Sequence, residues 1–176
     1  MIKIILSILI CILSFQSVAK ADDIRDFQIE GMSIGDSALD YFSKKSIDVA
    51  TFNVAPNNDK YVYANLKSRF NKNYDKVEIY YKKNDEKYII EAIAGTVNVK
   101  SINECKKKQK AISEEIKSIF PNSNFKNDQG LAPADKFKQS KYFRTGFALN
   151  PNSVFMEIEV LCIYYEGKAR KKFSSG

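Results

Sequence analysis

Residues 101–121 read SINECKKKQKAISEEIKSIFP and carry the most regular hydrophobic pattern in the chain. Apolar side chains recur there at spacings of seven, four and three residues, which places them on one stripe of an α-helix. The stripe consists of Cys105, Ile112, Ile116 and Ile119. Ser101 and Glu104 have the spacing of an N-terminal capping box, and Pro121 ends the helix. We therefore expect one long amphipathic helix, with its lysines mainly on the opposite side.

A strand near the C-terminus carries the second cysteine. From residue 154 to residue 165 apolar side chains alternate with others, so that Glu157 and Glu159 point away from the apolar face. That face carries Val154, Met156, Ile158, Val160 and Cys162. Since Cys105 and Cys162 both lie on apolar faces, we expect a disulfide that holds the helix across the sheet. Two free buried thiols are the alternative.

The remaining pattern predicts hairpins and one short helix. A helix from residue 37 to about residue 45 begins at Ser37, which has capping-box spacing to Asp40, and alternation at Phe27 and Ile29 indicates a first short strand. Strand-like runs cover residues 61–66, 77–82, 88–99 and 142–149. The second and third runs form one antiparallel hairpin, and the fourth pairs with the C-terminal strand.

Two further features complete the predicted fold. Gly95, inside the third strand, indicates a bulge or the close approach of another group. Residues 122–141 contain a glycine, a proline and many polar side chains, and we expect a long irregular loop there. The fold class is therefore α+β, an antiparallel sheet of about four to five strands packed against one long and one short helix, with one disulfide.

The N-terminus has the parts of a secretory signal peptide. Lys3 precedes an apolar run over residues 4–15, and small residues lead to Ala21. We expect residues 1–21 to be cleaved off, with a second site after Ala19. An uncleaved membrane anchor is the alternative, but the apolar run is shorter than the roughly 20 residues that span a bilayer.

The mature chain, residues 22–176, is expected to be a single α+β domain without a transmembrane segment. Cleavage removes Cys11, and the remaining even pair of cysteines indicates a periplasmic or secreted protein. Cleavage also removes Lys3 and Lys20, so that 26 of the 28 basic residues remain against 21 acidic ones, a net charge of +5. Most of these basic residues are scattered lysines, whereas a nucleic-acid-binding protein would be expected to have clustered arginines. The charge distribution therefore does not favour nucleic-acid binding.

The composition excludes several kinds of catalysis. The chain has no histidine, which excludes Ser-His-Asp and Cys-His catalysis and histidine-bound metals. Residues 35–37 match the opening of a GDS-type esterase motif, but Ser37 lacks a histidine partner and is better explained as a helix cap. The glycines match no nucleotide-binding motif, and we expect no cofactor, metal or catalytic residue. Glu157 and Glu159, about 6 to 7 Å apart along a strand, leave a carboxylate hydrolase as the alternative.

Tyrosines form the candidate binding surface. Tyr80, Tyr81, Tyr164 and Tyr165 make two adjacent pairs on or beside strands, and one member of each pair should face outward. Exposed tyrosines bind peptides, glycans or proteins at a low entropic cost. The alternative is that these rings cover helices or fill the core. A second candidate is the loop over residues 128–138, and the basic tail 168–172 either contacts anionic lipid or is solvated.

Residues 29–41, IEGMSIGDSALDY, resemble the entry to the first helix of small exported proteins similar to the SmpA/OmlA outer-membrane assembly lipoprotein and to β-lactamase-inhibitor-like domains. The second half, in which Glu104 and Cys105 open a lysine-rich helix and Cys162 lies late in a strand, resembles uncharacterised exported proteins of Gram-negative bacteria. The resemblance implies helices on a curved antiparallel sheet and an exported location. It implies no functional residues, and the chain lacks the lipidated cysteine of the lipoprotein members.

Together these observations predict a non-enzymatic periplasmic or secreted binding or envelope-accessory module. Its partner would be an envelope protein or ligand, of unknown identity, and its oligomeric state is open. The alternative is a small carboxylate-dependent hydrolase that acts on envelope glycans or peptides.

Overall fold

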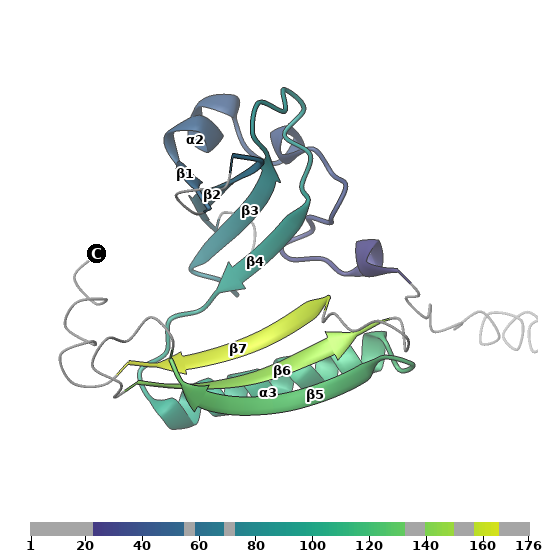
Figure 1. Ribbon diagram of the computed structural model, residues 1–176, viewed down its shortest axis with the longest axis vertical. Coiled ribbons are helices and arrows are strands. Elements are labelled where there is room, and N and C mark those ends of the chain that lie inside the picture. Colours follow the sequence, from purple (N-terminus) through teal and green to yellow (C-terminus); the bar gives the residue numbers. More distant parts are fainter. Residues whose placement is uncertain (1–22, 55–58, 69–72, 133–139, 150–156, 166–176) are drawn as a thin grey trace, which may run out of the picture.

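The computed structural model describes residues 23–54, 59–68, 73–132, 140–149 and 157–165. These residues form two antiparallel sheets that follow one another along the chain (Figure 1). The N-terminal sheet consists of β1 (Thr51–Asn53), β2 (Tyr61–Lys67), β3 (Lys76–Lys82) and β4 (Ala92–Thr96), in that order. The C-terminal sheet consists of β5 (Asn124–Leu131), β6 (Lys141–Ala148) and β7 (Ile158–Tyr164), in that order. The α+β class is therefore confirmed, but the prediction of a single sheet is wrong.

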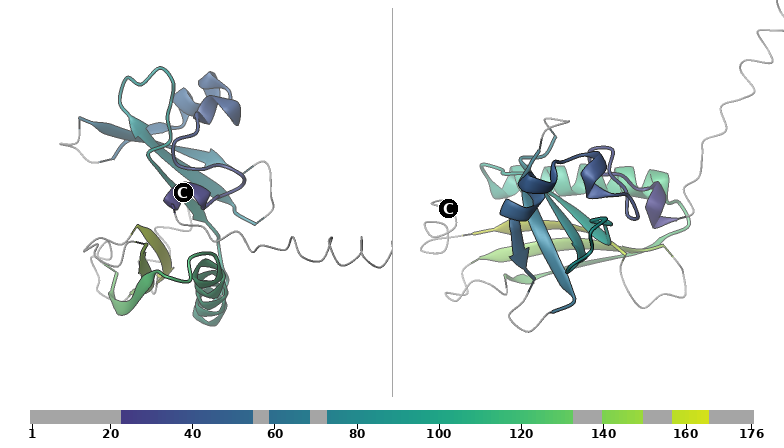
Figure 2. Two further views of the ribbon diagram at one scale, coloured as in Figure 1. Left: turned by 90° about the vertical axis from the view of Figure 1, so that its right-hand side faces the viewer. Right: turned by 90° about the horizontal axis from the view of Figure 1, so that it is seen from above.

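The two sheets are separate because each has its own helical cover. The helical segments that carry Ala38 and Ile47 contribute to the core of the N-terminal sheet. By contrast, α3 (Ile102–Ile119), which lies between the sheets in the sequence, packs on β6 and β7. Figure 2 shows α3 along one face of the C-terminal sheet. The buried side chains form two hydrophobic clusters accordingly, and Phe27 packs against both.

In the N-terminal sheet, one face is buried and the other is partly exposed. Along β2 and β3 every second side chain is buried, as the alternation at 61–66 and 77–82 predicts. The inner face meets a core in which Met32, Ile47 and Ile79 are fully buried. The outer face has no hydrophobic cluster over it among the described residues.

The predicted helix over residues 37–45 is replaced by two shorter ones, η2 (Ala38–Asp40) and α2 (Lys44–Val49). Ser37 does act as a cap, because its hydroxyl accepts a hydrogen bond from the Leu39 N–H. Ser43 provides a second cap by accepting from the Ser46 N–H, so the helix restarts there.

The strand predicted around Phe27 and Ile29 is absent from the described residues. A capping box between Asp23 and Asp26 instead sets up the 3-10 helix η1 (Ile24–Asp26). After it, Ile29 makes only a single β-bridge, with Met32.

The predicted hairpin over residues 77–99 is confirmed as β3 and β4. Its second strand begins later than expected because Tyr88 has a φ of 50°, which interrupts the extended backbone. Gly95 does mark a close approach, since a Cβ atom there would lie 2.4 Å from ring atoms of Tyr74.

The prediction of an irregular loop over residues 122–141 is wrong, because this segment contains β5, which pairs with β6 along its whole length. β5 is an edge strand whose side chains are mostly exposed. Its polar sequence therefore lacks the alternation by which a half-buried strand is recognised. Residues 133–139 lie outside the described residues.

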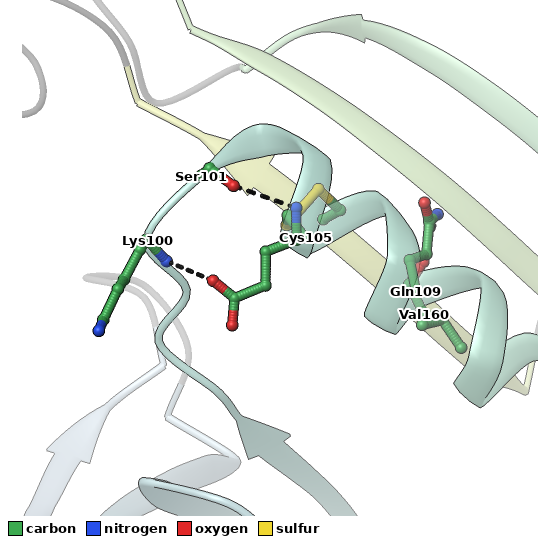
Figure 3. Close-up of a disulfide and its surroundings, with 7 residues drawn as sticks. Lys100, Ser101, Cys105, Gln109 and Val160 are labelled. Carbon is green, nitrogen blue, oxygen red and sulfur yellow. Dashed lines mark hydrogen bonds between the residues drawn. A yellow bond between two sulfur atoms is a disulfide. The ribbon is translucent and has the colours of Figure 1, made fainter.

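The disulfide between Cys105 and Cys162 is confirmed, and it joins the first turn of α3 to β7 (Figure 3). The two Cα atoms are 5.7 Å apart, and Cys162 is only 1% exposed. At the start of α3, the Ser101 hydroxyl accepts from the Glu104 N–H, as predicted. The Glu104 carboxylate accepts from the Lys100 N–H.

The predicted hairpin at the C-terminus is also present, as β6 and β7. Ile158, Val160 and Cys162 are buried while Glu157 and Glu159 are exposed, in agreement with the predicted faces. Val154 and Met156 lie outside the described residues, as does the predicted signal peptide. Within the described ranges, no helix has both the length and the apolar character of a membrane span.

Candidate binding surface

Three aromatic rings form a row across the outer face of the N-terminal sheet. Phe52 on β1 pairs with Tyr63 on β2, which pairs with Tyr80 on β3. The ring centroids of Phe52 and Tyr63 are 5.7 Å apart, and those of Tyr63 and Tyr80 are 5.5 Å apart with nearly parallel planes. Phe52 is 53% exposed, and both tyrosines are half-buried. We call this row, Phe52, Tyr63 and Tyr80, the aromatic face.

Polar groups of opposite sign flank the aromatic face. On one side, Glu78 accepts hydrogen bonds from the Tyr80 hydroxyl at 3.1 Å and from the Asn65 amide at 3.0 Å. On the other side, the Lys60 ammonium lies 5.1 Å from the centre of the Tyr61 ring. A ligand on the rings would therefore reach the Glu78 carboxylate on one side of the row and the Lys60 ammonium on the other.

Tyr80 is held in its neutral form. Burial of the ring and the nearby Glu78 carboxylate raise the pKa of the Tyr80 hydroxyl to about 12. The hydroxyl therefore remains a hydrogen-bond donor throughout the physiological range, and its bond to Glu78 fixes the orientation of the ring.

The structure divides the four tyrosines of the predicted surface between different environments. Tyr80 does face outward and Tyr81 inward, as the alternation requires. Tyr81 is 4% exposed, its hydroxyl is 2.7 Å from the Thr51 hydroxyl, and its ring packs beside Tyr88, so it belongs to the core. Tyr164 and Tyr165 are half-buried at the end of the C-terminal sheet, so the four tyrosines do not form one surface.

Sequence analysis missed Phe52 and Tyr63. Tyr63 lies in a recognisable strand, on the same side as Tyr61, and could have been assigned to the outer face. Phe52 lies in a strand of three residues, which is too short to show alternation. Only the pairing of β1, β2 and β3 brings the three rings together.

The two candidate carboxylates, Glu159 on β7 and Glu157 just before it, are engaged by other groups. Glu159 lies 3.2 Å from the Arg144 guanidinium, which also pairs with Asp128. Glu157 accepts a hydrogen bond from the Leu149 N–H at 3.0 Å. In these positions the two glutamates stabilise the C-terminal sheet and its hairpin.

A shallow hollow of about 330 Å³ lies between α3 and the strands β5 and β6. It is lined by Gln109, Asn127, Asp128, Gln129, Phe143, Arg144 and Thr145. Gln109 also donates to the Val160 carbonyl, so it links α3 to β7 (Figure 3). The described residues contain no cluster of three or more cysteine or acidic side chains that could hold a metal ion.

Comparison of the chain with protein-family models, curated proteins and solved structures found no match. The resemblance of residues 29–41 to exported envelope proteins therefore stays a prediction.

Proposed function

We propose that this chain is a non-enzymatic binding module of the periplasm or the extracellular space, and that it binds an envelope protein or ligand through the aromatic face. The observation that supports the proposal is the ordered row of Phe52, Tyr63 and Tyr80 on a partly exposed sheet face. Exposed aromatic side chains are enriched where proteins bind one another.

The disulfide supports the proposed compartment. Structural disulfides persist in oxidising surroundings and are rare in the cytosol. A buried cystine that ties α3 to β7 is compatible with a periplasmic or extracellular protein. The predicted signal peptide and the resemblance to exported proteins support the same location.

The aromatic face is suited to binding because its rings are already ordered. Stacking and the Tyr80–Glu78 hydrogen bond restrict the rings before a ligand arrives, so little side-chain entropy is lost on binding. Covering the exposed half of the Phe52 ring removes about 100 Å² from water, which contributes about 2.5 kcal/mol.

The proposal is tested by site-specific crosslinking. A photoreactive phenylalanine analogue replaces Phe52 in one variant and Leu161 in the other, because the two side chains are similarly exposed, 53% and 50%. In intact envelopes, the probe at position 52 should capture one partner in stoichiometric amounts, and the probe at 161 should not. Phe52→Ala should weaken binding of that partner, whereas Leu161→Ala should not. Equal capture from both positions would contradict the proposal.

A hydrolase would give a different result. The pure protein would turn over envelope glycans or peptides, and Glu157→Gln or Glu159→Gln would abolish that turnover.

A further inference from the structure

The outer edge of β5 carries a row of backbone groups without partners in the described structure. Beyond the end of β5, the Ala132 N–H donates to the Ser140 carbonyl, in the same register as the β5–β6 ladder. In an antiparallel ladder, hydrogen-bonded and non-hydrogen-bonded pairs alternate. The even-numbered residues of β5 therefore bond to β6, and the odd-numbered residues direct their N–H and C=O groups outward. These odd-numbered residues are Phe125, Asn127, Gln129 and Leu131, and all four are exposed.

β5 is a long strand for an unpaired sheet edge. β5 has eight residues and no proline, and Phe125 and Leu131 are 50% and 51% exposed. Proteins normally protect such an edge with short strands, prolines, bulges or charges, since it is a template for another strand. Here the charges are Lys126 and Asp128, two residues apart on the same face.

These two charges select one way of pairing β5 with itself. If two copies meet antiparallel with Asn127 opposite Asn127, then Lys126 of each copy is opposite Asp128 of the other. Shifting the pairing by two residues in either direction places Lys126 opposite Lys126, or Asp128 opposite Asp128. Opposite charges across a strand pair stabilise it and like charges destabilise it. The charge pattern is thus self-complementary in one register.

The backbone geometry allows this register. It makes hydrogen-bonded pairs of odd-numbered residues, whose groups point outward, and leaves Lys126 and Asp128 in a non-hydrogen-bonded pair, where side chains approach more closely. Asp128 already pairs with Arg144 of the same copy. A row of alternating charge would therefore run from Arg144 and Asp128 of one copy to Lys126 of the other.

We propose that two copies of this chain associate through β5, antiparallel and centred on Asn127, to form one continuous sheet of six strands. The partner is a second copy rather than an unrelated peptide because the strand supplies both the basic and the acidic half of the charge pattern. The interface is on the C-terminal sheet, so it leaves the aromatic face free.

The test is the oligomeric state of residues 22–176, measured by analytical ultracentrifugation over a range of concentrations. We expect a reversible dimer for the unmodified chain. Lys126→Asp and Asp128→Lys should each place like charges opposite one another and weaken the homodimer about tenfold or more. An equimolar mixture of these two variants should dimerise again, because each charge then faces its opposite.

Two control pairs test whether the β5 edge, in this register, holds the dimer together. Gln129→Pro removes an outward N–H and should abolish the dimer, whereas Gln129→Ala keeps that N–H and should not. Lys107→Asp makes the same change of charge as Lys126→Asp, but on the exposed side of α3, and should leave the dimer unchanged. Circular dichroism and thermal melting establish that each variant is folded.

A chain that stays monomeric at high concentration would overturn the proposal. So would a dimer that survives Gln129→Pro, or a mixture of Lys126→Asp and Asp128→Lys that fails to dimerise although both variants are folded.

Discussion

Reduction of the Cys105–Cys162 disulfide should lower the free energy of unfolding by about 4 kcal/mol. The two cysteines are 57 positions apart, so the bond closes a loop of 58 residues when both are counted. In the chain-entropy model, a loop of that length restricts the unfolded chain by about 4 kcal/mol. Domains of ordinary size have a net stability of about 5 to 15 kcal/mol, so this is a large share of the total.

The loss is measured by urea unfolding and by thermal melting with and without reductant. For a chain of this length, about 4 kcal/mol corresponds to roughly 10 °C in the melting temperature. The Cys105→Ala/Cys162→Ala variant should behave like the reduced protein. Cys162→Ser should be less stable still and express poorly, because the hydroxyl would replace a sulfur that is 1% exposed. Equal stability of the oxidised and reduced chains would refute the reasoning.

Three further perturbations follow from the packing and from the tyrosine hydroxyl. Gly95→Ala should cost about 1 to 3 kcal/mol in urea unfolding, because its Cβ would overlap the Tyr74 ring, and the cost should shrink in a Tyr74→Leu background. Phe147→Ala should cost about 3 to 5 kcal/mol in the same assay, since this ring is fully buried; a loss below about 1 kcal/mol would mean that the ring is not in the core. In an absorbance titration, Tyr80 should ionise near pH 12 rather than 10, and Tyr80→Phe should remove one late-titrating group. Because folding raises this pKa, the associated stability is complete below pH 10 and is lost as the pH rises toward 12.

The sequence predicted the elements whose side chains are half-buried. The stripe from Cys105 to Ile119 identified α3, and the alternation in residues 77–82 and 154–165 identified β3 and β7. In each of these elements one face is buried and the other is solvated, so the hydrophobic periodicity is visible in the sequence. The same faces placed both cysteines inward, which is why the disulfide was predicted.

The sequence could not predict elements that depend on pairing. β5 is almost wholly exposed, so its place in the sheet comes from the ladder with β6 and not from its own side chains. The division into two sheets depends on which strands α3 covers. The aromatic face likewise depends on pairing, since Phe52 and Tyr80 are far apart in the sequence and meet only through Tyr63.

The order of the two sheets along the chain also affects how the protein acquires its cross-link. All four strands of the N-terminal sheet precede Cys105, and every strand of the C-terminal sheet follows it. Chains generally begin to fold from the N-terminus as they emerge. During emergence, the first sheet would therefore assemble before either partner thiol is present, and oxidation would be delayed until β7 arrives. Cys105 would then be open to mispairing with a thiol of another chain from its appearance until β7 has docked and the bond to Cys162 has formed.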